Sequence, residues 1–377
     1  MLYLDHAATT PLRPEARRAM EPFLGDRFGN PSGMHAAARA AKNALEEARE
    51  RVAAVLGAGH PLDVVFTGGG TESDNLGVAG PVLADAAGRG AVVSAVEHEA
   101  VIETARFLAR LGRPVREIPV DGDGIVAPEA AAAAVGADTA VVSVMAANNE
   151  TGARQPVAEI AAAVRAAAPG VLVHTDAVQA AVSEEVTMQG LGVDLLTVAS
   201  HKVGGPKGVG ALVAGRGLLL EPVLHGGGQE SGRRSGTHDV AGIVGFAAAL
   251  EAAAADRERM RADVGEARAG FEAVLQAAIP GIVLTAPGRR LVQHCHVRLP
   301  GIDAATLLIR LDAAGVAASA GSACQSGAVG GSHVLAAMGI TGPEARSHLR
   351  FSFGWTTRPE DGPAAAAAVV AAVEALR

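Results

Sequence analysis

Residues 194–208 read Asp194-Leu-Leu-Thr-Val-Ala-Ser-His201-Lys202-Val-Gly-Gly-Pro-Lys-Gly208, an apolar strand that ends in a His-Lys pair before a glycine-rich turn. A lysine at the mouth of a buried strand is rare unless it is paired or used in chemistry. Glycines behind it let another molecule approach the backbone closely. An enzyme that holds an aldehyde cofactor as a Schiff base needs both features. A surface lysine at a strand end would show the same pair, so the pair alone does not decide.

Short apolar runs like this one recur along the chain and alternate with longer helical patterns. The runs lack polar alternation, which is typical of strands buried on both faces. Helices are expected at about 71–87, 98–111 and 157–168, between several of the strands. This alternation predicts an α/β fold with a mainly parallel sheet covered by helices. The expected strands are 63–66, 91–94, 140–145, 171–174, 194–198 and 210–213.

The chain has 377 residues, which is more than usually fold around a single hydrophobic core, so a second and smaller domain is expected. From about residue 239 to 278, an Ala/Glu/Arg-rich segment has helical spacing. Strand-like runs at 282–285 and 291–299, a helix near 304–314 and an alanine-rich terminal helix follow, which predicts an α+β unit. We therefore expect a large domain over residues 15–245, and a small domain made of residues 1–14 and 246–377.

Composition and charge exclude several classes of protein. Hydrophobic residues make up 49% of the chain and charged residues 19%, which is typical of a globular protein. The net charge of -8 and the lack of a basic stripe argue against direct nucleic-acid binding. No apolar stretch reaches the length of a membrane span, and the first residues lack the pattern of a signal peptide. Two cysteines cannot form a disulfide framework, so we expect a cytoplasmic protein.

Polar residues gather where the expected strands end, and ligand sites on such sheets lie at the C-terminal ends of the strands. After strand 63–66, the turn Thr67-Gly-Gly-Gly70-Thr71 opens a helix. The free N–H groups of that helix, with the Thr71 hydroxyl, suit a phosphate. Most glycine turns before helices bind nothing, however. His98, after strand 91–94, is either an aromatic cap and acid–base group or an ordinary first residue of a helix.

Amides and a carboxylate follow the next two strands. Asn148 and Asn149 come after strand 140–145, where they could contact a phenolate or a carboxylate, or form only an Asx turn. Asp176 ends the following strand, and Gln179 lies three residues further on. A carboxylate at the end of a buried strand is costly without a partner. A protonated ring nitrogen would supply that partner.

These positions together describe a single ligand. It has an aldehyde, a basic ring nitrogen, a phenolic oxygen, an aromatic ring face and a phosphate, and pyridoxal 5'-phosphate has all five. The residues that would meet them are, in the same order, Lys202; Asp176; Gln179 and Asn149; His98; and Gly70, Thr71 and His201.

On these residues the chain resembles the cysteine desulfurases of the fold-type I, class V aminotransferase group. The matching segments cover nearly the whole chain in the family's order, and agreement of that extent does not arise by chance. They are Leu4-Asp-His-Ala-Ala-Thr-Thr-Pro11, Phe28-Gly-Asn-Pro-Ser32 with His35, Thr71-Glu-Ser-Asp-Asn75, Glu97-His98, Asn148-Asn-Glu150, Asp176 with Gln179, His201-Lys202, His225-Gly-Gly-Gly-Gln-Glu230, Arg234-Ser-Gly-Thr237, Gly321-Ser-Ala-Cys324 and Leu349-Arg-Phe-Ser-Phe-Gly354.

The resemblance implies a fold-type I pyridoxal-phosphate transferase with a mainly parallel seven-stranded sheet in its large domain. It also implies roles for the residues around the cofactor ring. Lys202 would be the Schiff-base lysine and His98 would stack on the ring and carry protons. Asp176 would pair with the ring nitrogen, and Gln179 would contact the phenolic oxygen.

For the substrate and the phosphate, the resemblance implies a second set of contacts. Asn149 and Arg350 would hold the substrate carboxylate, with Arg350 as a bidentate fork. Thr71 and His201 would hold the phosphate, and Thr237 would reach it from the second subunit of a homodimer.

One position departs from the family pattern. Many relatives have Ser two residues before the His of the His-Lys pair, where it donates to the phosphate, whereas this chain has Ala199. Ser200 follows one residue later and need not point the same way. We therefore place neither residue among the phosphate contacts, and cofactor affinity could be somewhat lower.

The two cysteines have different surroundings in the sequence. Cys324 lies in a stretch of small residues, 319–332, without core-forming side chains, which favours a reactive thiol over a structural one. In the family such a loop carries the nucleophile that attacks the sulfur of bound cysteine. Cys295 lies instead in a strand, with His294 and His296 on the opposite face. These three cannot easily converge on a metal, so we expect no metal site and assign Cys295 to the core.

The sequence thus predicts a cysteine desulfurase that converts L-cysteine to L-alanine and leaves a persulfide on Cys324. Lys202 would remove the Cα proton, and the persulfide would pass to a sulfur-acceptor protein. That acceptor could serve iron–sulfur cluster assembly, tRNA thiolation or another sulfur modification. A pyridoxal-phosphate-dependent aminotransferase would not need Cys324, and a selenocysteine lyase would use nearly the same residues. A non-catalytic scaffold is disfavoured because the Lys, Asp, His, Arg and Cys positions are all filled.

Overall fold

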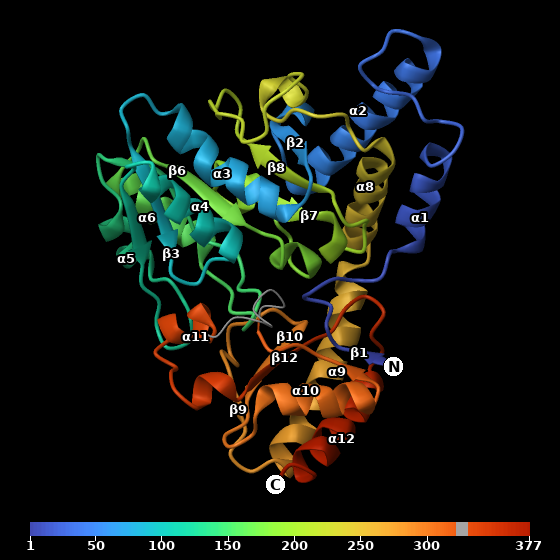
Figure 1. The fold of residues 1–377 in the computed structure, drawn as a ribbon, viewed down its shortest axis with the longest axis vertical. Coiled ribbons are helices and arrows are strands. Elements are labelled where there is room, and N and C mark those ends of the chain that lie inside the picture. The colour runs from blue at the N-terminus through green and yellow to red at the C-terminus, as the bar shows by residue number, and fades with distance from the viewer. Residues whose placement is uncertain (322–330) are drawn as a thin grey trace.

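A seven-stranded sheet forms the centre of the computed structural model, which describes residues 1–321 and 331–377. Its order is β2-β8-β7-β6-β5-β3-β4, and only β8 runs antiparallel, to both β2 and β7. The prediction of a mainly parallel seven-stranded α/β sheet is therefore confirmed (Figure 1). The strands are β2 (Val64–Thr67), β3 (Gly90–Ser94), β4 (Val115–Ile118), β5 (Thr139–Ser143), β6 (Leu172–Asp176), β7 (Leu195–Ala199) and β8 (Gly210–Ala214).

Helices cover both faces of this sheet, because alternate residues of each apolar strand point to opposite sides. Val64 and Phe66 pack into one core with α2 (Ala36–Leu56), α6 (Val157–Ala167) and α8 (Val240–Ala255). Val65, between them, packs into a second core with α3 (Gly70–Ala84) and α4 (Glu99–Arg110). The shorter helices α1 (Pro14–Met20), α5 (Pro128–Ala134) and α7 (Met188–Leu191) complete this part of the chain.

Two of the differences from the sequence expectation have a clear physical reason. The edge strand β4 was not predicted, because Arg116 and Glu117 interrupt its apolar pattern where one side of the strand lacks a neighbour. The helical segment from 239 to 278 is two helices, α8 and α9 (Arg257–Ala278), which meet at Asp256. Helix α8 is buried on nearly all sides, whereas α9 is buried on one side only and exposes its other side to solvent.

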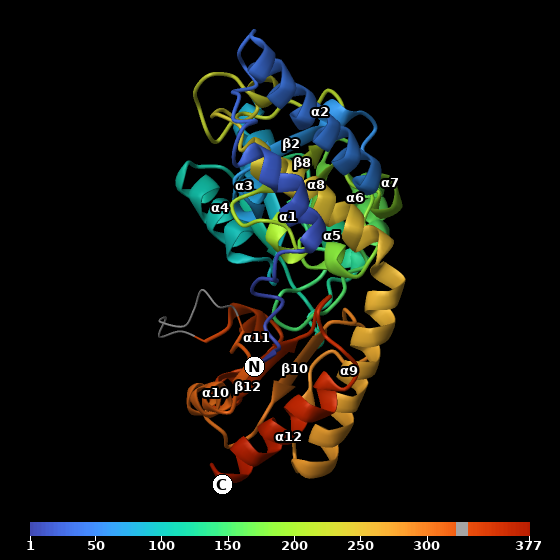
Figure 2. The same ribbon diagram turned by 90° about the vertical axis from the view of Figure 1, so that its right-hand side faces the viewer.

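A second, smaller unit lies beside the carboxyl ends of the central strands (Figures 1 and 2). Its antiparallel sheet has the order β12-β10-β9, and β1 pairs in parallel with β11. Helix α9 and residues of the N-terminal segment share its core. The division into residues 15–245 and residues 1–14 with 246–377 stays a prediction. The elements are β1 (Leu2–Tyr3), β9 (Val283–Leu284), β10 (His294–Arg298), α10 (Ala304–Ala313), β11 (Val316–Ala317), α11 (His333–Ala337), β12 (His348–Ser352) and α12 (Asp361–Glu374).

Cys295 belongs to this smaller core, as the sequence predicted. Its side chain is buried on β10 opposite Phe351 of β12, and burial raises the pKa of its thiol. The neighbouring His296 points the other way, where its ring nitrogens contact Thr285 at 2.8 Å and His348 at 3.0 Å. Within the residues that the structure describes, no three or more His, Cys, Asp or Glu side chains gather as metal ligands.

Replacing Cys295 by Ser should destabilise the protein by about 2 kcal/mol, because it buries a hydroxyl among apolar side chains. The midpoint of urea unfolding, with an unchanged slope, would report this loss. A variant with the wild-type midpoint would contradict the core assignment.

Candidate active site

The residues predicted to bind cofactor and substrate line one cavity of about 240 Å³ between the central sheet and the smaller unit. Thr237 is exposed and does not line it. Cys324 lies outside the described residues. The predicted residues that line the cavity are Gly70, Thr71, His98, Asn149, Asp176, Gln179, His201, Lys202 and Arg350.

The sheet brings these side chains together because its parallel strands end at one edge. Asp176 is the last residue of β6, and Lys202 follows β7 in a short 3-10 turn. His98 follows β3 as the first, capping residue of α4, and Asn149 follows β5. Arg350 comes instead from β12 of the smaller unit, so substrate binding would involve both units.

The N-terminus of α3 forms one end of the cavity, through Gly70 and Thr71. Gly69, which precedes the helix, has a φ of 140°, a conformation that favours glycine. A Cβ atom on Gly70 would lie 3.2 Å from Val178 and 3.3 Å from Ala199, so a side chain there would crowd the cavity wall. The helix of 15 residues presents its unpaired N–H groups at this end, which suits an anion.

Lys202 is held by the backbone of the N-terminal segment. Its Nζ donates to the carbonyl of Ala7 and, at 2.8 Å, to that of Ala8. The backbone N–H and the hydroxyl of Thr10 both donate to the carbonyl of His201, which fixes the segment beside the lysine. Ala7 and Ala8 line the cavity, yet sequence reasoning missed them, because backbone carbonyls contact the lysine and apolar side chains give no signal.

Asp176 lines the cavity at the end of β6. It is buried, and its Oδ1 accepts a hydrogen bond from the backbone N–H of Val178 at 2.8 Å. Burial raises the pKa of this carboxyl, whereas His98 and Lys202 lower it. A carboxylate in such a place is stabilised by a cation, which a protonated pyridine nitrogen would provide.

A buried polar network behind Asp176 was not found from the sequence. The two ring nitrogens of His174 contact the hydroxyls of Ser143 at 2.8 Å and Thr197 at 3.0 Å. Asp74, which lines the cavity, lies 3.8 Å from the same ring, and burial lowers the pKa of His174 to about 3. The alternation His174-Thr-Asp176 was the available signal, because residues two apart on a strand share a face.

Glu97 closes this network at the residue before His98. Its carboxylate accepts from the hydroxyls of Ser94 at 2.5 Å and Ser143 at 3.1 Å, and from the N–H of Met145 at 2.7 Å. Burial raises the pKa of Glu97 to about 7. The network therefore joins the backbone beside His98 to the strand that carries Asp176.

His98 caps helix α4 and also lines the cavity, so its role toward the cofactor ring stays a prediction. As the capping residue of α4, its Nδ1 accepts a hydrogen bond from the N–H of Ala100 at 3.1 Å. The neutral ring therefore carries its proton on Nε2. A capping histidine with a donor on its free side can still stack on a ring and carry a proton.

Gln179 and Arg350 already have partners within the chain. The Gln179 amide donates to the carbonyl of Ala7 at 3.0 Å, which leaves one N–H for a phenolic oxygen. Arg350 donates to the backbone carbonyl of Asn149 and to Asp5, each at 2.8 Å. A substrate carboxylate would therefore compete with Asp5 for the guanidinium.

The end of the cavity beside α3, where a phosphate would lie, has no hydroxyl from the strand before Lys202. Ala199 lines the cavity, whereas Ser200 does not. The Ser200 hydroxyl is buried without a hydrogen-bond partner, next to Gly205. His201 remains at this end, where its Nδ1 contacts the hydroxyl of Thr9 at 3.2 Å and burial lowers its pKa to about 4.

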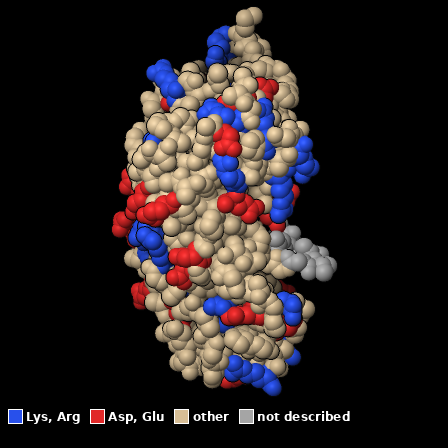
Figure 3. All heavy atoms as spheres, turned by 90° about the vertical axis from the view of Figure 1, so that its left-hand side faces the viewer, with Lys and Arg blue, Asp and Glu red and all other residues tan. Residues whose placement is uncertain are grey.

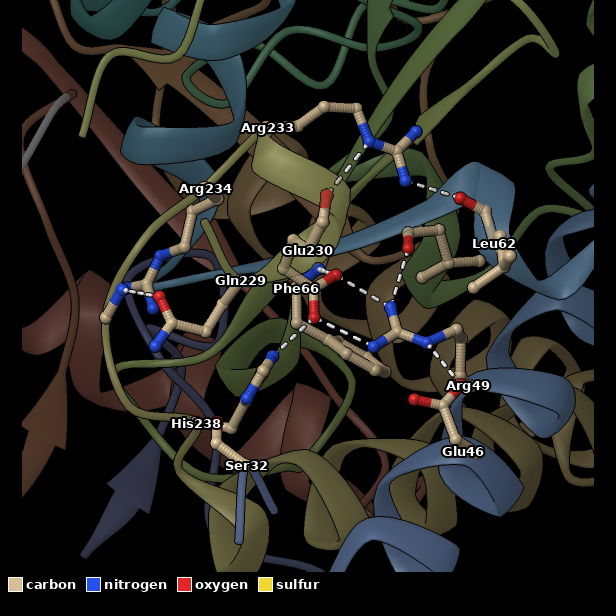
Figure 4. A network of polar contacts seen from close by, with 12 residues as sticks. Ser32, Glu46, Arg49, Leu62, Phe66, Gln229, Glu230, Arg233, Arg234 and His238 are labelled. Carbon is tan, nitrogen blue, oxygen red and sulfur yellow. Dashed lines mark hydrogen bonds and ion pairs between the residues drawn. The ribbon is translucent and has the colours of Figure 1, made fainter. Parts of the chain in front are cut away.

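The loop that carries Thr237 is attached to the sheet by a buried ion pair (Figure 4). Glu230 accepts from both terminal nitrogens of Arg49 at 2.7 and 2.8 Å, from the N–H of Phe66 at 3.0 Å and from His238 at 2.6 Å. Although burial raises its pKa, the bonds from His238 and Arg49 bring the pKa of Glu230 down to about 2. Glu230 itself has a φ of 51°, a strained conformation that these contacts stabilise.

Comparisons with known proteins identify the family of the chain. The class-V aminotransferase family model matches residues 2–361. A cysteine desulfurase IscS of Dictyoglomus turgidum is 40% identical, over 96% of this chain and 91% of its own. An IscS-like cysteine desulfurase of Mycobacterium tuberculosis is 41% identical, over 100% of this chain and 97% of its own. The solved structure of a NifS-like protein superposes with a TM-score of 0.91 at 33% identity, and covers 99% of each chain.

The chain therefore belongs to the class-V aminotransferase family, whose members depend on pyridoxal phosphate. Within that family, its resemblance to the cysteine desulfurases is confirmed by these relatives. The predicted pyridoxal 5'-phosphate dependence is confirmed as well. The residue assignments themselves stay predictions.

Replacing Glu230 by Gln should destabilise the fold by about 3 kcal/mol at neutral pH, because it removes the buried counter-charge of Arg49 and leaves only the partly exposed Glu46, 3.1 Å from its Nε. The folded pKa of about 2 lies below the ordinary value for Glu, so this carboxylate stabilises the fold fully above the ordinary value. That stabilisation fades as the pH falls toward 2. Denaturant unfolding at several pH values should show the difference between wild type and variant shrink on acidification.

The matched control is Glu251→Gln, which removes the partially exposed ion pair with Arg51. That change should cost less than about 1 kcal/mol. Equal losses in the two variants would contradict the importance of the buried pair.

Proposed function

We propose that the protein is a pyridoxal-phosphate-dependent cysteine desulfurase, which converts L-cysteine to L-alanine and keeps the sulfur as a persulfide on Cys324. The observation that carries this proposal is one cavity that holds Lys202, Asp176 and Arg350 together. A cofactor aldehyde, a ring nitrogen and a substrate carboxylate each find a matching partner there. Relatives that match almost the entire chain bear the name cysteine desulfurase.

The cavity residues fit the cofactor at each of its polar groups. Lys202 would hold the aldehyde and Asp176 the ring nitrogen, while the second N–H of Gln179 would reach the phenolic oxygen. Gly70, Thr71 and His201 would hold the phosphate, and His98 would cover the ring face. When bound, the cofactor supplies a sink for the electrons that the Cα–H bond releases.

The chain's own groups would then handle the substrate and its protons. Arg350 and Asn149 would orient the cysteine carboxylate, with Arg350 exchanging Asp5 for the substrate. Lys202 would take the Cα proton. His98, with its proton on Nε2, would carry a proton to or from the sulfur.

Sulfur transfer would need a thiolate from the chain. The Cys324 thiolate would form a bond with the substrate sulfur, and the carbon–sulfur bond would break with its electron pair moving to carbon. Protonation of that carbon, and return of the Cα proton from Lys202, would yield alanine. A persulfide would remain on Cys324, ready for an acceptor protein in iron–sulfur cluster assembly, tRNA thiolation or another sulfur modification.

A homodimer would complete the phosphate end of the cavity. Thr237 is exposed, on a loop that Glu230 and Arg49 hold in place, so it is available to a second subunit. We place the enzyme in the cytoplasm, without direct contact with nucleic acid or membrane. Acidic and basic side chains lie interspersed on the face in Figure 3, and no helix in the described part of the chain is long and apolar enough to cross a membrane.

Lys202→Ala should reduce alanine formation from cysteine by roughly 10³-fold or more, because the chain loses its covalent attachment to the cofactor and its base. Lys207→Ala, at an exposed lysine of the same glycine-rich turn, is the matched control and should keep wild-type turnover. The protein should also lose its yellow colour only in the Lys202 variant. Wild-type turnover in Lys202→Ala would remove this residue from the mechanism.

Cys324→Ser should bind cofactor and cysteine as the wild type does, yet release no sulfide, because neither binding step uses the thiol. After brief exposure to cysteine, the wild-type peptide that contains Cys324 should gain the mass of one sulfur atom. The Cys295→Ser variant should keep this gain, since Cys295 is buried in the core. Sulfur on Cys295, or full sulfide release by Cys324→Ser, would remove Cys324 from the mechanism, whereas amino-group transfer without any sulfur release by the wild type would favour an aminotransferase.

A further inference from the structure

Glu150 is a fully buried carboxyl next to Asn149, and it has no role in the proposed reaction. The turn after β5 places it there. The side-chain oxygen of Asn148 accepts from the N–H groups of Glu150 and Thr151, both at 2.9 Å. One oxygen of Glu150, Oε1, has no hydrogen-bond partner. A buried carboxyl that is only partly satisfied is costly, so its position calls for a structural reason.

The other oxygen of Glu150 meets the smaller unit at two places. Oε2 accepts a hydrogen bond of 2.6 Å from the hydroxyl of Ser332. A Cβ atom on Gly321 would lie 2.9 Å from Oε2 and 3.1 Å from the ring of His348, and the φ of Gly321 is 68°. Only glycine fits so close to the carboxyl in this conformation. Gly321 and Ser332 stand on either side of the segment that contains Cys324.

The chain after Ser332 is attached to the same part of the large sheet. His333 Nε2 contacts the backbone carbonyl of Glu97 at 2.9 Å. Val334, Leu335 and Met338 form a small core with Val96. The two attachment points therefore adjoin His98 and Asn149 in the chain, the residues proposed to carry protons and to orient the substrate.

The charges around Glu150 suit a fixed anchor. Burial raises the pKa of its carboxyl, while Ser332, His333 on α11 and Arg350 on β12 lower it and Glu99 on α4 raises it. Arg350 is also the proposed ligand of the substrate carboxylate. The same carboxyl thus faces both the substrate-binding arginine and the ends of the cysteine-bearing segment.

We propose that Glu150 is a positioning residue that fixes both ends of the Cys324 segment against the substrate end of the cavity. This inference rests on the proposed function, because it assigns a purpose to the placement of that segment. Glu150 touches neither cofactor nor substrate in this proposal. It acts through Gly321 and Ser332.

The test uses the full-length enzyme loaded with pyridoxal phosphate. Glu150→Ala should keep cofactor and cysteine affinity within about twofold, yet form the Cys324 persulfide at least about tenfold more slowly, since a misplaced reacting group costs rate rather than binding. Glu150→Gln keeps the shape and a hydrogen bond to Ser332, so it should restore most of that rate. Ser347→Ala, which removes a serine hydrogen bond elsewhere in the small unit, is the control and should leave the rate unchanged.

Hydrogen exchange gives a readout that does not depend on activity. Backbone amides of residues 332–338 should exchange faster in Glu150→Ala, and those of α10 should not change. Ser332→Ala and Gly321→Ala should reproduce the effect if Glu150→Ala does not fold. Unchanged exchange in residues 332–338, or equal losses of cysteine affinity and persulfide rate, would overturn the anchor. A wild-type enzyme without persulfide on Cys324 would instead overturn the proposed function, while the exchange rates still test the anchor.

Discussion

The site depends above all on the hydrogen bonds from the Lys202 ammonium to the carbonyls of Ala7 and Ala8. They connect the glycine-rich end of β7 to a segment that begins in the other unit, where Leu4 lies in the small core. The carbonyl of Ala7 also accepts from Gln179, and Asp5 binds Arg350. A few residues at the start of the chain thus hold a lysine, an amide and an arginine in one cavity. A partly buried lysine needs such hydrogen-bond partners to hold its side chain in one direction.

Two buried carboxyls of the large unit, Glu230 and Glu97, are stabilised in two different ways. Glu230 pairs with a guanidinium and keeps its charge over the whole physiological range, which suits a rigid support for the loop of Thr237. Glu97 has only hydroxyl and N–H donors, so burial raises its pKa to about 7. The contrast follows from chemistry, because a formal opposite charge stabilises the ionised form more than neutral donors do. A carboxyl that titrates near neutrality therefore lies beside the proposed proton carrier, His98.

The two units divide the proposed reaction between them. Strand ends of the large sheet supply most of the groups that line the cavity and that, in our proposal, hold the cofactor. The smaller unit supplies Arg350 and the segment with Cys324, which in our proposal separate desulfuration from transamination. In this proposal, contacts between the two units position the substrate relative to the thiol. Examples are the hydrogen bonds of Arg350 with Asn149 and of Ser332 with Glu150.

The sequence by itself determined the central sheet and most residues of the candidate site, because both depend on local sequence patterns. Unbroken apolar runs identified six central strands, while β4, with Arg116 and Glu117, carried too weak a pattern. Polar residues at strand ends identified Lys202, Asp176 and His98, since parallel strands bring their ends to one edge. Only the tertiary structure revealed the contacts between residues far apart in the chain. The carbonyls of Ala7 and Ala8, the attachment of Glu230 to Arg49 and the approach of Gly321 to Glu150 have no local signal, because each depends on how separate segments pack.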